Sequence, residues 1–347
     1  MRVIATAGHV DHGKSALVQR LTGQNPDRWD EERRRGLTIG LGFVWTTLPG
    51  GREVAFVDVP GHERFVPTML AGVGPVPAVL FVVAADEGWM PQSAEHLEAL
   101  DAFGVRHGLL VVTRSDLADP EPARRAALEA MAGTSLAGPR SVAVSSVTGA
   151  GFDDLLAELT RLTDALPPPD PDADVRLWVD RSFTVAGAGT VVTGTLSAGT
   201  LHVGDELVVA STGRAVRVRS LQSLERPHDE VAAFARVAVN LRGVDRAEAG
   251  HGDALLTPGR WLTTDLADAV VSADPGQLRG DLTVHVGSAG VPVHVRPLGA
   301  TSARLRLRRP LPLRAGDRLL VRDPGGHRVL ARADVVDPRP PGLRRRG

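Results

Sequence analysis

Residues 8–15 have the sequence GHVDHGKS and fit the phosphate-binding pattern G-x-x-x-x-G-K-[ST], between a run typical of a strand and one typical of a helix. Glycines let the backbone curl so that its N–H groups face phosphate oxygens, and the start of the helix adds positive charge. Lys14, the only lysine among 40 basic residues, would place its ammonium between the β- and γ-phosphates. Ser15 would offer its hydroxyl to Mg²⁺. The pattern predicts a nucleoside triphosphate site rather than a glycine-rich turn with a surface lysine.

A second motif, Asp58-Val59-Pro60-Gly61-His62, stands at the end of an expected strand over 53–58. The Asp58 carboxylate could hold Mg²⁺ through a water molecule, and the Gly61 N–H could reach the γ-phosphate. Between the two motifs lies a basic, glycine-containing segment, residues 32–40. Its Thr38 could join the Mg²⁺ shell only while the γ-phosphate is present. We therefore expect this segment to be an on/off element rather than a solvated loop.

The identity of the base is indicated by the sequence TRSD at 113–116, which follows a hydrophobic run. Asp116 could accept hydrogen bonds from guanine N1–H and the 2-amino group together, a donor pair that adenine lacks. An aspartate that only caps the start of a helix is the alternative. A backbone N–H within 145–147 could meet guanine O6. The expected cofactors are GTP and Mg²⁺, and the expected GTP contacts are Gly8, His9, Val10, Asp11, His12, Gly13, Lys14, Ser15, Asp58, Gly61, Thr113, Arg114, Asp116, Ser145, Ser146 and Val147.

These motifs need a scaffold, and residues 1–166 supply an alternation of β-rich and helical runs. Such alternation predicts a parallel sheet covered on both faces. We expect strands over 3–7, 53–58, 78–83, 108–113 and 141–144, and helices over 15–21, 92–103, 122–131 and 151–166. A stiff Pro/Asp-rich linker follows at 167–174. Short alternating runs then predict two antiparallel β-barrels, over 175–259 and 260–337, before a Pro/Arg/Gly-rich linker at 338–347.

Composition narrows the class of protein. The net charge of −1 gives no global basic field, so any contact with RNA must use a local patch. The absence of cysteine excludes a disulfide framework and a thiolate zinc site. The longest apolar stretch, 77–85, is too short for a bilayer, and no signal peptide precedes the first motif. We expect a cytoplasmic protein with no membrane contact.

The nucleotide motifs, in this order, resemble the GTP-binding domain of translational GTPases. The sequences GHVDHGKS, RGLTI and DVPGH are specific to that group rather than to Ras-like proteins or ATPases. Segments 31–43, 58–69, 179–185, 187–195 and 240–244 look most like the selenocysteine-specific elongation factors (SelB). The resemblance implies a multidomain α/β plus β protein, with a P-loop GTPase domain followed by two antiparallel β-barrels. It also implies GTP hydrolysis coupled to delivery of selenocysteinyl-tRNA to the ribosome at UGA.

The resemblance assigns further roles. It implies that His62 positions the attacking water, and that Val10 and Leu37 form a hydrophobic gate that holds His62 back until activation. It also implies that the second domain receives the selenocysteinyl end of the tRNA. A selenol is ionised near neutral pH, so a basic pocket would prefer it to the neutral hydroxyl of serine. Arg181 and Arg242 are the candidates for this pocket, with ordinary surface arginines as the alternative.

Two features depart from the family pattern. Arg114 stands where the guanine motif usually has lysine, whose stem lies over the base; arginine can also stack there, so we expect altered nucleotide affinity. The helical winged domains with which bacterial members read a messenger-RNA hairpin are not in this chain, so either a C-terminal region outside it or another molecule would make that contact. The other functions to weigh are a general elongation factor, an initiation factor, the GTPase subunit of a sulfate-activating nucleotidyl transferase and a nucleotide-responsive scaffold.

Overall fold

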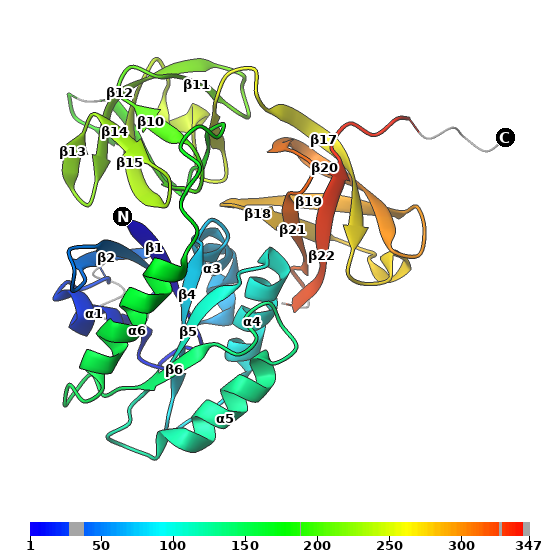
Figure 1. Cartoon of the computed structure of the whole chain (residues 1–347). Coiled ribbons are helices and arrows are strands. Elements are labelled where there is room, and N and C mark those ends of the chain that lie inside the picture. Colours follow the sequence, from blue (N-terminus) through cyan, green and yellow to red (C-terminus); the bar gives the residue numbers. More distant parts are fainter. Residues whose placement is uncertain (28–37, 188, 326–327, 343–347) are drawn as a thin grey trace.

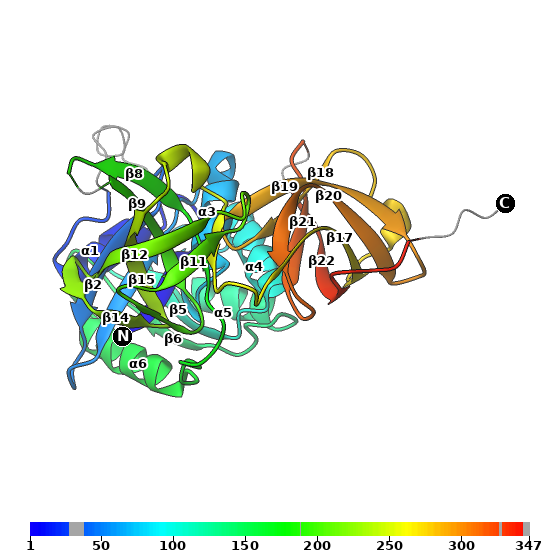
Figure 2. The ribbon, with the colours of Figure 1, turned by 90° about the horizontal axis from the view of Figure 1, so that it is seen from above.

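The computed structural model describes residues 1–27, 38–187, 189–325 and 328–342. Its elements fall into an N-terminal α/β lobe and two β-barrels (Figure 1). From above, the first barrel lies over the N-terminal lobe and the second barrel extends to one side (Figure 2). No element crosses the expected boundaries, because α6 ends at Ala165, β7 begins at Arg176, β16 ends at Leu256 and β17 begins at Leu262. We retain the division into domains at these points as a proposal.

The N-terminal lobe is built on a six-stranded sheet with the order β2-β3-β1-β4-β5-β6. Neighbours from β3 to β6 run parallel, whereas β2 pairs antiparallel with β3 at the edge. The sheet is therefore mixed, and the expectation of a parallel sheet missed this edge strand. The elements are β1 (Arg2–Ala7), α1 (Lys14–Thr22), β2 (Gly42–Thr47), β3 (Glu53–Asp58), η1 (Glu63–Phe65), α3 (Val66–Val73), β4 (Ala78–Ala84), α4 (Pro91–Phe103), β5 (His107–Thr113), α5 (Pro120–Met131), β6 (Arg140–Ala143) and α6 (Phe152–Ala165).

Both faces of this sheet are buried, which explains its continuous apolar strands. Within β1, Val3 packs in a core with α3, α4 and α5, whereas Ile4 packs in a second core with α1 and α6. Every residue of β4 is buried, because successive side chains enter opposite cores. The carboxyl ends of β1, β3, β4 and β5 consequently lie along one edge of a rigid layer, and the motif residues follow them.

The first barrel is a ring in the order β11-β16-β7-β9-β15-β12, closed by pairing of β11 with β12. Strand β8 adds to β9, β13 adds to β12, and β10 pairs with β14 in a small separate sheet. Alternate residues of β15 are buried, so one face of that strand packs in the barrel core. The elements are β7 (Arg176–Trp178), β8 (Arg181–Val185), β9 (Gly189–Leu196), β10 (Thr200–His202), β11 (Glu206–Val209), β12 (Ala215–Ser223), β13 (Arg226–His228), β14 (Glu230–Ala232), β15 (Ala235–Arg242), η2 (Arg246–Glu248) and β16 (Ala254–Leu256).

The second barrel is closed in the order β17-β20-β19-β18-β21-β22. Its core is aliphatic, and Trp178 of the first barrel packs against it. A buried ion pair between Arg176 and Asp317, at 2.6 Å, also joins the two barrels. The elements are β17 (Leu262–Val271), η3 (Pro275–Gln277), β18 (Leu282–Val286), β19 (Ala289–Pro297), β20 (Ser302–Leu313), β21 (Arg318–Asp323) and β22 (Arg328–Asp337).

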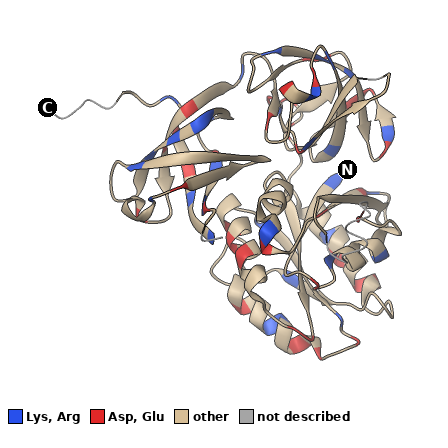
Figure 3. Ribbon diagram, turned by 180° about the vertical axis from the view of Figure 1, so that it is seen from behind, with Lys and Arg blue, Asp and Glu red and all other residues tan. Residues whose placement is uncertain are grey.

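Both barrels contact the N-terminal lobe. Arg226 of the first barrel pairs with Glu53 at 3.3 Å, and α4 packs against β21 and β22 of the second barrel. On the face seen in Figure 3, basic and acidic segments are interspersed over all three parts. Among the described helices, none has the length and apolar character needed to span a bilayer.

Candidate nucleotide site and its comparison with known proteins

The phosphate loop lies between β1 and α1 and has the conformation that its glycines permit. Gly8 has φ +126°, and a Cβ atom there would lie 2.1 Å from the Val82 carbonyl oxygen, so a larger residue would not fit. Gly13, at φ +82°, precedes the first residue of α1. The Lys14 ammonium is buried and donates to the carbonyl oxygens of Gly8 (3.0 Å) and His9 (2.6 Å). The loop thus curls around this cation, which is the arrangement a phosphate site requires.

Oxygen atoms from three separate segments converge next to Lys14. The Ser15 hydroxyl donates to Asp58 Oδ2 at 2.6 Å and lies 2.9 Å from Thr38 Oγ1. Thr38 also donates to Asp27 Oδ1 at 2.9 Å. Hydroxyl and carboxylate oxygens are the donors that Mg²⁺ prefers, so these residues fit the ion. Among the described residues, no group of three His, Cys, Asp or Glu side chains could hold a metal, so Mg²⁺ would depend on this set and on the nucleotide.

Asp58 is held in place at the end of β3 by Thr6, a residue that the sequence analysis did not single out. Thr6 Oγ1 donates to Asp58 Oδ1 at 2.7 Å and accepts from the Val59 N–H at 3.1 Å. Burial raises the pKa of Asp58 to about 6, although hydrogen bonds from Ser15 and Thr6 oppose the shift. Burial also lowers the pKa of Lys14 to about 8. Bound Mg²⁺ and phosphate would favour the charged form of each group.

The guanine half of the site lies at the ends of β5 and β6. Buried Thr113 donates to the His12 carbonyl oxygen at 2.7 Å and so joins this half to the phosphate loop. Asp116 is exposed, and it is not the cap of α5: that helix begins at Pro120, and Asp119 caps it by accepting from the Glu121 N–H. The alternative reading of Asp116 as a helix cap is therefore wrong.

One cavity of about 510 Å³ brings the two halves together. Its lining includes Lys14, Ser15, Thr38 and Gly61 from the phosphate side and Asp116 from the base side. Of the other expected contacts, Val10, Asp11, Gly13, Thr113, Arg114, Ser146 and Val147 also line it, and Ala16, Asp27 and Leu117 are additions. The remaining expected contacts do not line the cavity but accept hydrogen bonds from residues in or beside the lining; they are Gly8, His9, His12, Asp58 and Ser145.

Helix α4 accepts hydrogen bonds from the backbone of the phosphate loop, a support that was not predicted from the sequence. The Gly8 N–H donates to His96 Nδ1 at 3.0 Å, and the Val10 N–H donates to Gln92 Oε1 at 3.1 Å. Burial lowers the pKa of His96 to about 3, so the ring stays neutral and its Nδ1 can accept. The pattern of Gln and His four residues apart on one helix face is the signal that could have revealed this support.

Models of three known protein families match successive parts of the chain. The model of the elongation factor Tu GTP binding domain matches residues 1–165, that of elongation factor Tu domain 2 matches 189–256, and that of the β-barrel domain of the selenocysteine-specific elongation factor matches 273–342. The selenocysteine-specific elongation factor of Desulfomicrobium baculatum is 37% identical, over 97% of this chain and 56% of its own length. The crystal structure of the bacterial selenocysteine-specific elongation factor EF-Sec superposes with a TM-score of 0.91 at 34% identity, over 98% of this chain and 59% of that one.

The chain belongs to the selenocysteine-specific elongation factor family of translational GTPases. Residues 1–165 are accordingly a GTP-binding domain of the elongation factor Tu type. SelB from Methanococcus maripaludis, solved in complex with the GTP analogue GppNHp, has a TM-score of 0.83 at 25% identity, over 98% of this chain and 79% of that one. The chain spans 56% of the length of the curated relative from D. baculatum.

The residue that the family resemblance makes catalytic, His62, is half-buried and does not line the nucleotide cavity. Its Nδ1 accepts from the Arg64 N–H at 3.2 Å, so it caps η1. Gly61 packs closely against the loop, because a Cβ there would lie 2.6 Å from the Val10 nitrogen. Val10, one half of the expected gate, therefore lies beside the backbone that carries His62. Leu37, the other half, lies outside the described residues.

The two arginines expected to form the selenocysteinyl pocket lie apart. Arg181 shares a hollow of about 260 Å³ with Phe43 and Arg236, between β2 and the first barrel. Arg242 is exposed and lines a different hollow with Arg214, Arg219 and Arg246. Arg181 and Arg242, the two candidates for one pocket, therefore do not come together, because the register of the barrel brings Arg236 to Arg181 instead.

The basic side chains that line the Arg181 hollow are held in place by hydrogen bonds and by contacts with an aromatic ring. Arg236 donates to both carboxylate oxygens of Asp180 and to Thr193 Oγ1, and its guanidinium carbon lies 3.7 Å from the Phe43 ring centroid. Arg181 donates to the Leu41 carbonyl oxygen, and its guanidinium carbon lies 5.2 Å from the same ring. Exposed Glu225 also lines the hollow. Buried Asp180 neutralises Arg236, and Arg181, held by the Leu41 carbonyl oxygen, brings a second guanidinium to the same hollow.

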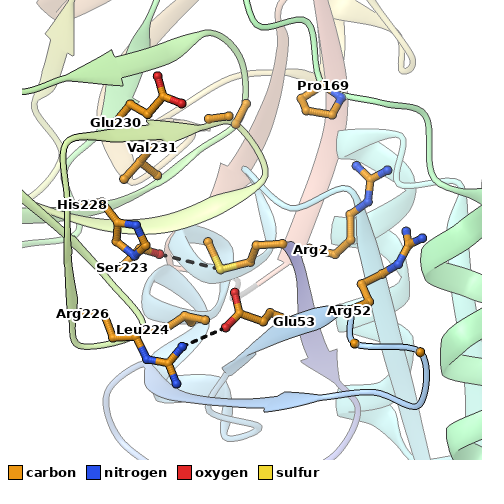
Figure 4. A pocket seen from close by; sticks show the side chains of 15 residues that line it. Arg2, Arg52, Glu53, Pro169, Ser223, Leu224, Arg226, His228, Glu230 and Val231 are labelled. Carbon is orange, nitrogen blue, oxygen red and sulfur yellow. Dashed lines mark hydrogen bonds and ion pairs between the residues drawn. The ribbon is translucent and has the colours of Figure 1, made fainter.

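A further hollow, of about 600 Å³, separates the β2–β3 hairpin from β12–β14 (Figure 4). Arg226 faces Glu53 across it, and Ser223 contacts the Met1 sulfur at 3.7 Å. Arg52 turns to Asp164 at 2.6 Å, and Arg2 donates to the carbonyl oxygens of Leu166 and Pro167. These guanidinium groups are paired within the protein, so we assign the hollow to the interface between lobe and barrel rather than to a nucleotide.

Proposed function

We propose that the chain binds GTP with Mg²⁺, hydrolyses the γ-phosphate bond and delivers selenocysteinyl-tRNA to the ribosome at UGA, in the cytoplasm. The cavity lined by Lys14, Ser15, Thr38 and Asp116, with Asp58 hydrogen-bonded to Ser15 next to it, is the observation that carries the GTPase part. Mg²⁺, when bound there, neutralises phosphate charge. The chain's own residues divide the remaining work: the phosphate loop orients the triphosphate, and Asp116 selects the base.

The selenocysteine part of the proposal is supported by the Arg181 hollow. A selenolate that enters a partly dry cleft needs a fixed positive charge, or the loss of its hydration is uncompensated. Arg181 lines such a hollow beside Phe43 and the Asp180-paired Arg236, and it contacts the segment that follows Thr38.

The decisive experiment is a pull-down of aminoacyl-tRNAs by the chain in the presence of GTP. We expect selenocysteinyl-tRNA to be retained, and seryl-tRNA and bulk aminoacyl-tRNA to be lost. Equal retention of all three would indicate a general elongation factor. Retention of none, with intact GTP turnover, would favour the subunit of a nucleotidyl transferase or another role outside translation.

Replacing Asp116 with asparagine should shift the base preference from guanine towards xanthine by on the order of 10²-fold. The reason is that the asparagine NH₂ group can donate a hydrogen bond to the 2-carbonyl of xanthine. The 2-amino group of guanine is itself a donor, so it cannot accept this bond. Competition between GTP, XTP and ATP for the full chain measures the shift. Asp119→Asn is the matched control, because Asp119 caps α5 and should leave the base preference unchanged. A wild-type chain that binds ATP as tightly as GTP would contradict the site assignment.

A further inference from the structure

Arg114 does not lie free over the place of the base but joins three segments of the nucleotide site. Its Nη1 donates to Asp86 Oδ2 at 2.9 Å and to Glu87 Oε1 at 2.6 Å. Its Nη2 donates to the Asp11 carbonyl oxygen in the phosphate loop. The guanidinium therefore connects the guanine loop at 113–116, the turn at 84–88 after β4 and the phosphate loop.

The two acids are fixed next to Arg114 by the backbone. The Ala85 N–H donates to the Thr113 carbonyl oxygen at 2.9 Å, and the Gly88 N–H closes the turn on Ala84, also at 2.9 Å. On its other side, Glu87 Oε2 lies 3.6 Å from Nε2 of His12, a buried phosphate-loop residue. The turn thus contacts both halves of the site, and its carboxylates converge on one cation.

This arrangement suits arginine and not lysine. A planar guanidinium can donate to two carboxylates and a carbonyl at once, whereas an ammonium on a flexible stem is a single point charge. Arg114 also has φ +55°, a left-handed conformation that a long side chain adopts at some cost. Contacts from its side chain to three fixed acceptors can hold the residue in this conformation. The departure from the family's usual lysine therefore has a structural counterpart in Asp86 and Glu87.

We propose that Asp86 and Glu87 are positioning residues of the nucleotide site, which act through Arg114 to hold the guanine loop against the phosphate loop and slow the release of guanine nucleotides. The proposal rests on the guanine-nucleotide binding proposed above and adds how the nucleotide is retained. Among the described residues, the contacts of this cluster do not include Asp116 or the Ser15, Thr38 and Asp58 oxygens, so it should act equally on GTP and GDP. It should leave the preference for guanine over adenine unchanged.

The test is the dissociation rate of fluorescent GDP and GTP from the full chain, measured by stopped flow. We expect Asp86→Asn combined with Glu87→Gln to raise both rates about tenfold, the scale for losing hydrogen bonds to a charged group. Arg114→Lys should raise them to a similar degree. In an Arg114→Ala background, removing the two acids should change the rates less than about threefold, since the cation through which they act is gone.

Glu158→Gln is the matched control, because Glu158 pairs with Arg140 and Arg161 at the surface of the same lobe and should leave the rates unchanged. Unchanged rates in the Asp86/Glu87 variant would overturn the proposal. An equal effect of the acids in the wild-type and Arg114→Ala backgrounds would also overturn it, because the acids would then act on the fold of the turn alone. A wild-type chain that releases GDP as fast as ADP would instead overturn guanine-nucleotide binding itself.

Discussion

Replacing His62 with alanine is expected to slow ribosome-stimulated GTP hydrolysis by about 10²–10⁴-fold, the usual loss when a group that acts on the reacting water is removed. GTP binding should stay nearly intact, because His62 does not line the cavity that would hold the nucleotide. The measurement is single-turnover hydrolysis on ribosomes beside equilibrium binding of GTP. A loss in rate without a loss in affinity identifies an interaction made only in the transition state.

The structure allows the water-positioning role to be separated from a local structural one. His62 Nδ1 caps η1 through the Arg64 N–H, so alanine removes a cap as well as an imidazole. Asparagine can cap a helix start but presents a different group to the water, so His62→Asn should be as slow as His62→Ala. If His62→Asn retained the wild-type rate, the cap would be the important feature. His202→Ala, at an exposed histidine of the first barrel, should show no change.

Replacing Arg181 with alanine should weaken the binding of selenocysteinyl-tRNA by roughly 2–5 kcal/mol, the loss typical of removing one partner of a buried charge pair. Seryl-tRNA, which brings no charge to the hollow, should lose far less, and GTP affinity should not change. Arg181 is a better test than Arg236, because removing Arg236 would leave Asp180, only 6% exposed, as an unpaired buried charge and disturb the fold. Filter binding of the two aminoacyl-tRNAs in GTP measures the difference.

Arg242→Ala is the matched control for this experiment. Arg242 lies on the same strand as Arg236 but is exposed in another hollow, so its removal should not alter the discrimination between selenocysteine and serine. Equal losses for both aminoacyl-tRNAs in Arg181→Ala would mean that Arg181 contacts RNA phosphate. If Arg242→Ala selectively lost binding of selenocysteinyl-tRNA, Arg242 would belong to the pocket, as the sequence suggested.

The fold was predictable where the sequence pattern was long and periodic. The strand over 53–58 has the predicted bounds, and the helix expected over 92–103 begins one residue earlier, at Pro91. The edge strand β2 (Gly42–Thr47) and helix α3 (Val66–Val73) were missed. Both lie in or beside the motif segments, whose residue types follow the needs of the nucleotide site rather than the apolar period of a helix or strand. Strand β2 is specified mainly by its pairing with β3.

The nucleotide motifs were determined by the sequence alone because each is contiguous in the chain. A phosphate loop depends on the conformation of a few successive residues, and the strands before Asp58 and Thr113 place the two ends at one edge of a parallel sheet. The elements that surround these motifs could not be deduced in the same way. Thr6, His96 and Glu87 each lie dozens of residues from the site residue that they contact, and only the packing of their elements brings them to it.

The amino-acid pocket shows most clearly what tertiary structure decided. Residues 236, 238, 240 and 242 share one face of β15, because side chains alternate along a strand. The sequence therefore could not choose between Arg236 and Arg242 as the neighbour of Arg181. The choice follows from register: Arg181 pairs with Thr193, and Thr193 pairs with Ala238. Arg236, two residues from Ala238, pairs with Asp180 beside Arg181. Arg242 lies about 20 Å from Arg236 along the strand at the usual rise per residue.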